Sequence, residues 1–423
     1  MDELAGPPWL AAARRQAFAT FSEAGMPTEA EEVWRYSRVE DLDLERFRPM
    51  GPAPRAGSVP GGKVEEVTGL LEGGEWAGTA VTRDGSLAEA SLPHDAGPDG
   101  LSVWGLAGGS GQIDLGPAEI GPDAFSALAA AFLADAVVVD VAPGVVLADP
   151  VLVVHWVGSD GAAVFPRTVV RLGEGARARV AEVVVSGDVA SLVVPVTRLV
   201  VGDHAELSYL GIQELGPATW QLGYQRHSLA RGARLTSFVA ALGGDYARLR
   251  TDSVLEGAGA SSDLLAAYFG RRDQVLDFRT QQDHVAPATR SDLFFKGAVA
   301  DDARSVYTGL IRVRKGAVGT NAFQTNRNLV LSDGAHADSV PNLDIAENDV
   351  RCSHASAVGP VDPEQRYYLE SRGVPPEVAD RLIVLGFFED ILGRLPFAAL
   401  SEHLRGEIGD RVAAALPGAG GRP

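Results

Sequence analysis

Two residues near the C-terminus, Cys352 and His354, are the side chains best suited to metal chemistry. If Val350–Val358 forms a strand, both lie on one face, with backbone positions about 6.6 to 6.8 Å apart. Thiolate and imidazole bind metals at about 2.0 to 2.3 Å, so the pair can bind one metal ion or one cluster iron. A structural metal site usually takes four ligands, so the others must come from distant coils or another chain. The alternative is a buried, apolar Cys352 and a hydrogen-bonded His354.

Motifs typical of enzymes are scarce in the rest of the sequence. It contains no G-x-x-x-x-G-K-[ST] phosphate loop, no G-x-S-x-G elbow and no H-E-x-x-H helix. The run Gly108–Gly111 lacks the spaced third glycine of a dinucleotide fold, so we interpret it as a loop. A single cysteine rules out a C-x-x-C pair and an internal disulfide. We therefore expect neither a catalytic residue nor a bound nucleotide in this chain.

A set of aspartates recurs near the predicted turns of the second half of the chain. In a secreted β-helix such carboxylates can gather calcium for a polysaccharide lyase, but their scattered spacing favours solvated turn residues. The set comprises Asp301, Asp302, Asp333, Asp338, Asp344 and Asp349.

The charge balance excludes several partners. The 37 basic and 56 acidic residues give a net charge of −19, which repels phosphate backbones and anionic lipid surfaces, so we expect no nucleic acid and no membrane partner. Met1–Trp9 has neither a basic start nor an apolar core, which together with the single cysteine suggests a reducing cytoplasm. The most apolar window, Ala127–Val141, contains two aspartates and is shorter than the roughly 20 residues of a membrane helix.

A turn that recurs every 27 to 29 residues indicates how the candidate ligands are positioned. Between these turns the residues are β-branched and alternate with a period of two, as in Leu192–Val201 and Leu310–Arg314. Small turn residues suit coils that stack about 4.8 Å apart. We predict a mainly β fold with a parallel β-helix or flattened β-solenoid core. The turns are Gly175-Ala176, His204-Ala205, Gly232-Ala233, Gly259-Ala260, Pro287-Ala288, Gly316-Ala317 and Ile345-Ala346.

Four regions follow from the composition along the chain. Residues 1–47 are predicted to be helical, residues 48–134 a linker and mixed segment, residues 135–361 the β-helix core and residues 362–423 a C-terminal helical domain. Thr28–Glu31 matches a capping box that restarts a helix.

Capping signals and an apolar stripe predict further helices. Gly121–Phe125 opens an alanine-rich helix, and Asp362 with Pro363 opens the first of three C-terminal helices. The last of these has an apolar stripe at four-residue spacing, which either packs on the protein's own neighbours or docks a partner. The stripe consists of Leu400, Leu404, Ile408, Val412 and Leu416.

The sequence also resembles a known family at both ends and in the repeat between them. Asp349–Gly359 followed by Glu364–Gly373 closely resembles the C-terminal signature of the SufB/SufD family of iron–sulfur cluster assembly proteins. Glu32–Ser37 resembles the family's Trp-Lys-Tyr-Thr element, and Leu382–Pro396 also fits.

Within the family, the chain is more similar to the SufD branch than to the SufB branch. SufB-like chains have a cysteine in the strand corresponding to Gln324–Leu329 and a His-Glu pair at His354-Ala355, where this chain has Asn326 and Ala355. The principal scaffold ligands of a SufB-like chain are therefore missing.

The resemblance implies a right-handed parallel β-helix with helical N-terminal and C-terminal domains. It implies a noncatalytic subunit of a SufBCD complex, which pairs with SufB through the β-helix and docks the ATPase SufC through its C-terminal helices. His354, with Cys352 as a second candidate, is then expected to hold a nascent iron–sulfur cluster or iron transiently shared with SufB. The alternatives are a SufB-like homodimeric scaffold and a stand-alone β-helix carbohydrate-active enzyme.

Overall fold

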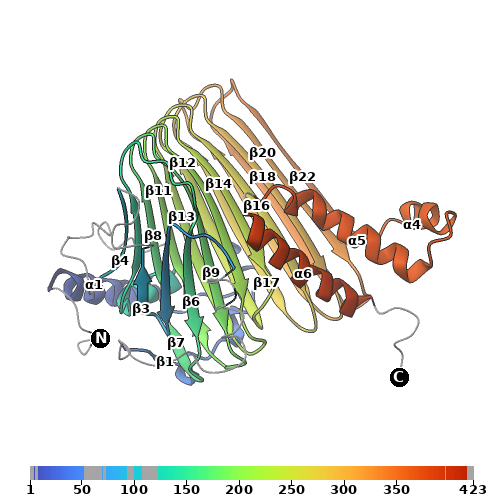
Figure 1. Cartoon of the computed structure of the whole chain (residues 1–423), viewed down its shortest axis with the longest axis horizontal. Helices are drawn as coiled ribbons and strands as arrows, with labels where there is room; N and C mark the ends of the chain where they lie inside the picture. The colour runs from blue at the N-terminus through green and yellow to red at the C-terminus, as the bar shows by residue number, and fades with distance from the viewer. Residues whose placement is uncertain are drawn as a thin grey trace.

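The computed structural model describes residues 4, 8–51, 69, 73–92, 100–106, 122–395 and 397–416. They form a long β-solenoid whose two sheets run the length of the molecule (Figure 1). Sheet A contains, in spatial order, β21 (His336–Ile345), β19 (Arg304–Val313), β17 (Val275–His284), β15 (Tyr246–Leu255), β13 (Trp220–Leu229), β11 (Val196–Val201), β8 (Arg167–Leu172), β5 (Val137–Val141) and β4 (Leu101–Gly105), with β1 (Arg48–Pro49), β7 (Ala162–Val164) and β10 (Leu192–Val193) beside this path. Sheet B contains β22 (Arg351–Gly359), β20 (Asn321–Val330), β18 (Arg290–Val299), β16 (Ser261–Gly270), β14 (Arg234–Ala241), β12 (Glu206–Glu214), β9 (Arg177–Ser186), β6 (Val151–Val157), β2 (Gly78–Arg83) and β3 (Ser86–Ser91).

The chain alternates between the two sheets, so each coil contributes one strand to each. From β8 onward, long strands pair in parallel and in register with strands one coil away, as in β12 with β14 and β17 with β19. The predicted β-solenoid is confirmed. Because registers are kept, residues at matching positions stack in columns, and each column points either into the interior or outward.

The recurring turns have a common backbone requirement. Gly175, Gly232, Gly259 and Gly316 have positive φ values, and His204 adopts the same conformation with a φ of 57°. Glycine occupies this left-handed region without a Cβ penalty, which explains its recurrence just before the turn alanine. In the coil at Pro287-Ala288 the positive φ is shifted to the alanine, at 56°.

Helices cover the outer faces of both sheets. α1 (Pro8–Ala24) and α3 (Ala124–Ala131) pack together on the outside of sheet A near its N-terminal end. The helix predicted to open within Gly121–Phe125 forms as α3, and Asp123 caps it, because its carboxylate accepts the backbone N–H of Ser126 at 3.0 Å. α5 (Pro376–Leu392) and α6 (Ala398–Ala415) lie across sheet B, and α4 (Pro363–Glu370) projects beyond them (Figure 1).

The apolar stripe of α6 packs inside the protein. Leu400, Leu404, Ile408 and Val412 are all buried in one cluster with α5 and the outer face of sheet B, and Leu416 packs against this cluster. Two polar contacts reinforce the packing: His403 Nε2 lies 2.8 Å from Glu214 Oε1, and Arg411 donates to the carbonyl of Leu242. The interpretation of this stripe as a docking surface is therefore wrong.

Two local predictions also need correction. The helix expected to restart at Thr28 is replaced by the 3-10 turns η1 (Glu32–Trp34), η2 (Val39–Asp41) and η3 (Leu44–Arg46). Half of the capping box does form, since Glu31 accepts the N–H of Thr28, but the segment lies flat on sheet A with Trp34 buried. The strand expected over residues 192–201 is split into β10 and β11 by Pro195, which has no N–H for the ladder.

The sheets also include strands that precede residue 135. β2 pairs in parallel with β6, while β3 and β4 pair antiparallel with β2 and β5, so the strand direction reverses at this end. Among the described residues, no helix has both the length and the apolar character needed to cross a membrane.

Candidate functional site

The two candidate ligands lie on the last strand of sheet B, at the open end of the solenoid. β22 pairs with β20 on one side only, so its other edge has no strand partner. Cys352 is in register with Ala322, and His354 with Gln324. Ala322 and Gln324 are buried, which places Cys352 and His354 on the interior face, as their two-residue spacing predicts. We call this opening, bounded by β21 and β22, the mouth of the solenoid.

Cys352 is the more enclosed of the two ligands. It is half-buried and packs against a cluster formed by Ile311, Val313, Ala317 and Ala322. Burial raises the pKa of the Cys352 thiol, and a backbone hydrogen bond from Ala322 offsets this only in part. In the free chain this residue is therefore a thiol, and metal binding would have to displace its proton.

His354 is exposed, because no further coil covers the interior face of β22. After β22 the chain leaves the solenoid at Asp362, whose carboxylate accepts the N–H of Glu364 and caps α4. No described residue forms a hydrogen bond with the imidazole of His354. Both ring nitrogens are therefore free to meet a ligand or a partner.

The described residues do not complete a metal site. They contain no group of three or more His, Cys, Asp or Glu side chains arranged to hold a metal ion. Three of the six aspartates considered as calcium ligands form ion pairs: Asp301 with Arg271, Asp338 with Arg304, and Asp344 with Arg312. Cys352 and His354 thus offer two of the four ligands of a tetrahedral site, and the part of the chain that the structure describes does not bring the others to them.

A layer of buried carboxamides lies one coil beneath the mouth. Gln324, Asn326 and Asn328 all point inward from β20 and are almost fully buried. Asn326 donates to the Tyr268 hydroxyl at 2.9 Å, Tyr268 donates to Asn328 at 2.6 Å, and Asn328 donates to Asn326 at 2.7 Å. The triangle satisfies its members, so the position where a SufB-like cysteine is expected is filled by a structural amide.

This carboxamide layer was missed in the sequence. Its signal is the alternation Gln324-Thr325-Asn326-Arg327-Asn328, in which every inward position is an amide. In β18, one coil earlier, the matching inward positions are Leu293 and Phe295. A switch from apolar to amide side chains at constant period marks the approach to the open end.

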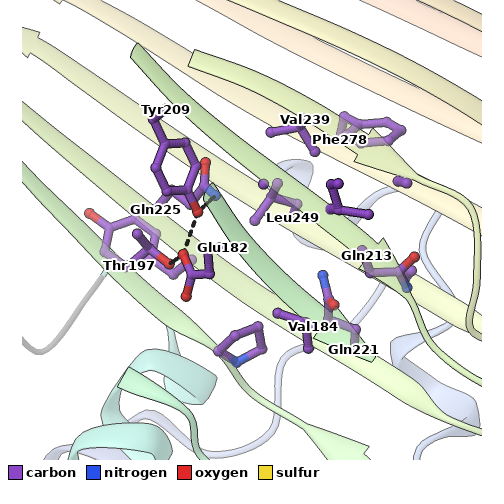
Figure 2. A pocket seen from close by; sticks show the side chains of 16 residues that line it. Glu182, Val184, Thr197, Tyr209, Gln213, Gln221, Gln225, Val239, Leu249 and Phe278 are labelled. Carbon is purple, nitrogen blue, oxygen red and sulfur yellow. Dashed lines mark hydrogen bonds between the residues drawn. The ribbon is translucent and has the colours of Figure 1, made fainter. Parts of the chain in front are cut away.

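A second polar cluster lies deep inside the solenoid, beside a cavity of about 40 Å³ (Figure 2). The Glu182 carboxylate accepts hydrogen bonds from Thr168, Thr197, Tyr209 and His155. Burial opposes ionisation of Glu182, but the hydrogen bond and charge of His155, with the hydroxyl donors Tyr209 and Thr168, hold its pKa below the usual range. The cavity has room for a few water molecules and not for an organic substrate. We therefore assign this cluster a structural role.

These features define a class: a β-solenoid whose candidate metal site is left incomplete at an open end. Comparison with known proteins identifies the family. The family described as "SUF system FeS cluster assembly, SufBD core domain" matches residues 155–387, which is more than half of the chain. The chain belongs to this SufBD family of iron–sulfur cluster assembly proteins.

Individual relatives support this assignment. A SufBD family protein of Mycobacterium leprae is 31% identical over 359 residues, covering 82% of this chain and 88% of the relative. The iron-sulfur cluster assembly protein SufD of Escherichia coli is 27% identical over 396 residues, covering 92% and 90%. A SufBD family protein of Mycobacterium bovis is 38% identical over 219 residues, covering 50% of this chain and 55% of the relative. The chain thus matches only about half the length of the Mycobacterium bovis relative.

Proposed function

We propose that this chain is a noncatalytic scaffold subunit of a cytoplasmic iron–sulfur cluster assembly complex. It pairs with a SufB-type chain through the mouth of the solenoid and shares a nascent cluster or iron with it through His354 and Cys352. The observation that supports this most directly is the position of two metal ligands, too few for a site, on an unpaired edge strand at the open end. No nucleotide is bound by this chain, and ATP hydrolysis belongs to a SufC-type partner.

The edges of the mouth favour a β-partner. β21 and β22 are both long edge strands, and they end the two sheets at the same end of the solenoid. Leu343, Ile345 and Val358 point inward from these strands yet remain 37%, 41% and 45% exposed. Long edges with exposed apolar side chains are aggregation hazards unless another chain covers them. A homologous solenoid edge would satisfy the free backbone groups and bury these side chains together.

The C-terminal helices offer a separate surface for the ATPase. Tyr367 and Tyr368 on α4 are 73% and 59% exposed, and Leu382 and Leu385 on α5 also face solvent. Exposed tyrosine and leucine side chains on neighbouring helices are typical of a protein interface. Because the apolar stripe of α6 is already buried, we place docking of the ATPase on α4 and the outer face of α5.

The test is anaerobic coexpression of this chain with candidate SufB and SufC chains, followed by size exclusion with light scattering and iron quantification. His354→Ala should leave the complex and its stability nearly intact, because an exposed side chain is not a core determinant, while the bound iron falls. The matched control is His336→Ala. His336 is another exposed histidine on an edge strand, but it lies in register with Arg304 and faces outward.

Each result has a definite meaning. A stable heteromer whose iron falls in His354→Ala, and not in His336→Ala, supports the shared site. A heteromer with unchanged iron would refute the role of His354. A lone homodimer would instead favour the symmetric scaffold, and a lone monomer would overturn the pairing.

A further inference from the structure

Two buried polar atoms beside the mouth have no hydrogen-bond partner among the described residues. They are Nε2 of Gln324 on β20 and the hydroxyl of Ser339 on β21. Buried donors without an acceptor are rare in native proteins, since each one costs about 1 to 3 kcal/mol. Unpartnered atoms also occur in the sealed interior, at His227 and Gln282, but the two at the open end can be reached by an acceptor that arrives from outside.

The register places both atoms around the same space. His354 lies one strand beyond Gln324 in sheet B, and Ser339 lies one strand beyond Tyr307 in sheet A. The Tyr307 hydroxyl donates to Gln324 Oε1 at 3.3 Å, so these two side chains meet across the interior. Ser339 and His354 are each the next residue along the stack from this hydrogen-bonded pair. Since neighbouring strands are about 4.8 Å apart, both lie that much closer to the open end, on opposite sheets. Gln324 then lies one strand deeper in the solenoid than Ser339 and His354.

We propose that Gln324 and Ser339 are positioning residues of the His354 site, which donate hydrogen bonds to an anionic atom bound to the metal. The chemistry selects this ligand class. The Oε1 of Gln324 accepts from Tyr307, so its N–H donors are left for a further acceptor, and Ser339 on the edge strand of the other sheet offers an unpartnered O–H. An imidazole that binds a metal and two donors that bind the anion on that metal are complementary. For an iron–sulfur assembly protein this anion is a sulfide, or a hydroxide before sulfide arrives.

This inference rests on the proposed function, because it assumes that His354 holds iron. It adds two residues that neither the motif nor the metal-ligand spacing identifies. Partners of this kind orient ligands around a metal, and their loss typically weakens metal binding by 10- to 100-fold.

The test uses the copurified complex and measures Fe²⁺ binding by anaerobic titration, together with the visible absorption after sulfide is added. We expect Gln324→Leu to weaken Fe²⁺ binding by about 10- to 100-fold, and Ser339→Ala to weaken it less, by about 3- to 10-fold, because Ser339 supplies a single donor. Gln324→Glu keeps the shape of the side chain and replaces the N–H donors with a carboxylate. It should therefore bind sulfide-loaded iron at least as poorly as Gln324→Leu, a result that loss of packing alone does not predict.

The matched control is Gln282→Leu. Gln282 on β17 is also a fully buried, inward-pointing glutamine whose amide has no partner among the described residues, but it lies two strands further from the mouth than Ser339. Its substitution should leave Fe²⁺ binding and the absorption spectrum unchanged, and circular dichroism should show all variants folded.

The outcomes separate this inference from the proposed function. If His354→Ala leaves iron binding unchanged, the proposed function fails, whatever Gln324 does. If His354→Ala weakens iron binding while Gln324→Leu behaves like Gln282→Leu, only the role of Gln324 and Ser339 is refuted. The role of Gln324 and Ser339 is also refuted if Gln324→Glu binds sulfide-loaded iron as tightly as the unmodified complex does.

Discussion

His227 provides a quantitative test of how strongly burial in the solenoid interior disfavours a charged side chain. This residue lies on β13 and is completely buried, and burial lowers the pKa of its imidazole to about 3. The folded protein therefore keeps His227 neutral, whereas the unfolded chain takes up a proton near pH 6.5. Because the folded pKa is the lower one, stability is fully present above pH 6.5 and is lost as the pH falls toward 3. Over the whole window this loss is about 5 kcal/mol, at about 1.36 kcal/mol per pKa unit.

The prediction can be checked above the isoelectric point of about 4.8, where the chain keeps a net negative charge. Between pH 7.0 and 5.5, proton linkage to His227 predicts a loss of about 1.3 kcal/mol in the free energy of unfolding. His227→Phe should remove this part of the pH dependence, as measured by urea unfolding followed by tryptophan fluorescence. His284, whose pKa burial lowers to about 4, titrates in both proteins, so the difference between them isolates His227.

The control is His204→Asn, which removes an exposed imidazole from a turn with positive φ and installs a residue that tolerates this conformation. It should keep the pH dependence of the unmodified chain. If His227→Phe also loses the full amount between pH 7.0 and 5.5, His227 is not held neutral by burial, and the reasoning is refuted.

Two further predictions concern the core and the coils. Glu182→Leu leaves four buried hydrogen-bond donors without their acceptor and should lower the free energy of unfolding by about 3 to 5 kcal/mol in urea titrations. The control Glu206→Gln, at a half-exposed position, should change the free energy of unfolding by less than about 0.5 kcal/mol. Similar losses in both variants would refute a special role for the Glu182 cluster. Gly257→Ala should lower the melting temperature, because a Cβ there would lie 2.0 Å from the backbone nitrogen of Arg231, while Gly406→Ala in α6 meets no atom within 4 Å and should stabilise by about 1 kcal/mol. Calorimetry of both glycine variants decides this, and a shift opposite to either expectation would contradict the steric argument.

Much of the architecture could be predicted from the sequence because the coils repeat. Each coil needs a residue that accepts positive φ followed by a small residue that is buried at the turn, so Gly175-Ala176 and Gly316-Ala317 mark the period directly. The starts of the helices at Asp123 and Asp362 could also be predicted, because each aspartate accepts a hydrogen bond from a backbone N–H only two or three residues away.

The failures have a common physical cause, which is competition from contacts distant in sequence. The segment after Thr28 does not form an α-helix because it packs along the outer face of sheet A as a series of short 3-10 turns. Trp34 packs under the guanidinium of Arg248, 3.8 Å from the ring centroid, and Arg248 and Arg279 donate to the carbonyls of Val33 and Arg35. From the sequence, the apolar stripe of α6 could pack either on the protein itself or on a partner protein. The fold shows that it packs on sheet B.

The candidate site was half predictable. Two-residue spacing places Cys352 and His354 on one face, but the exposure of that face depends on where the last coil ends. The proposed grouping of Ser339 and Gln324 with His354 depends on the register of two different sheets and on the Tyr307–Gln324 hydrogen bond between them. No spacing within one strand contains that information.

The unequal ends of the solenoid limit how far it can polymerise. The C-terminal end presents edge strands of ten and nine residues, while the N-terminal end finishes in antiparallel strands of six and five residues, β3 and β4. The proposed head-to-head union through the long edges would use the only extended pairing surface of the described residues and leave the short, reversed strands outermost. Such strands are poor templates for another chain, so the proposed assembly would close at two solenoids instead of growing into a fibre.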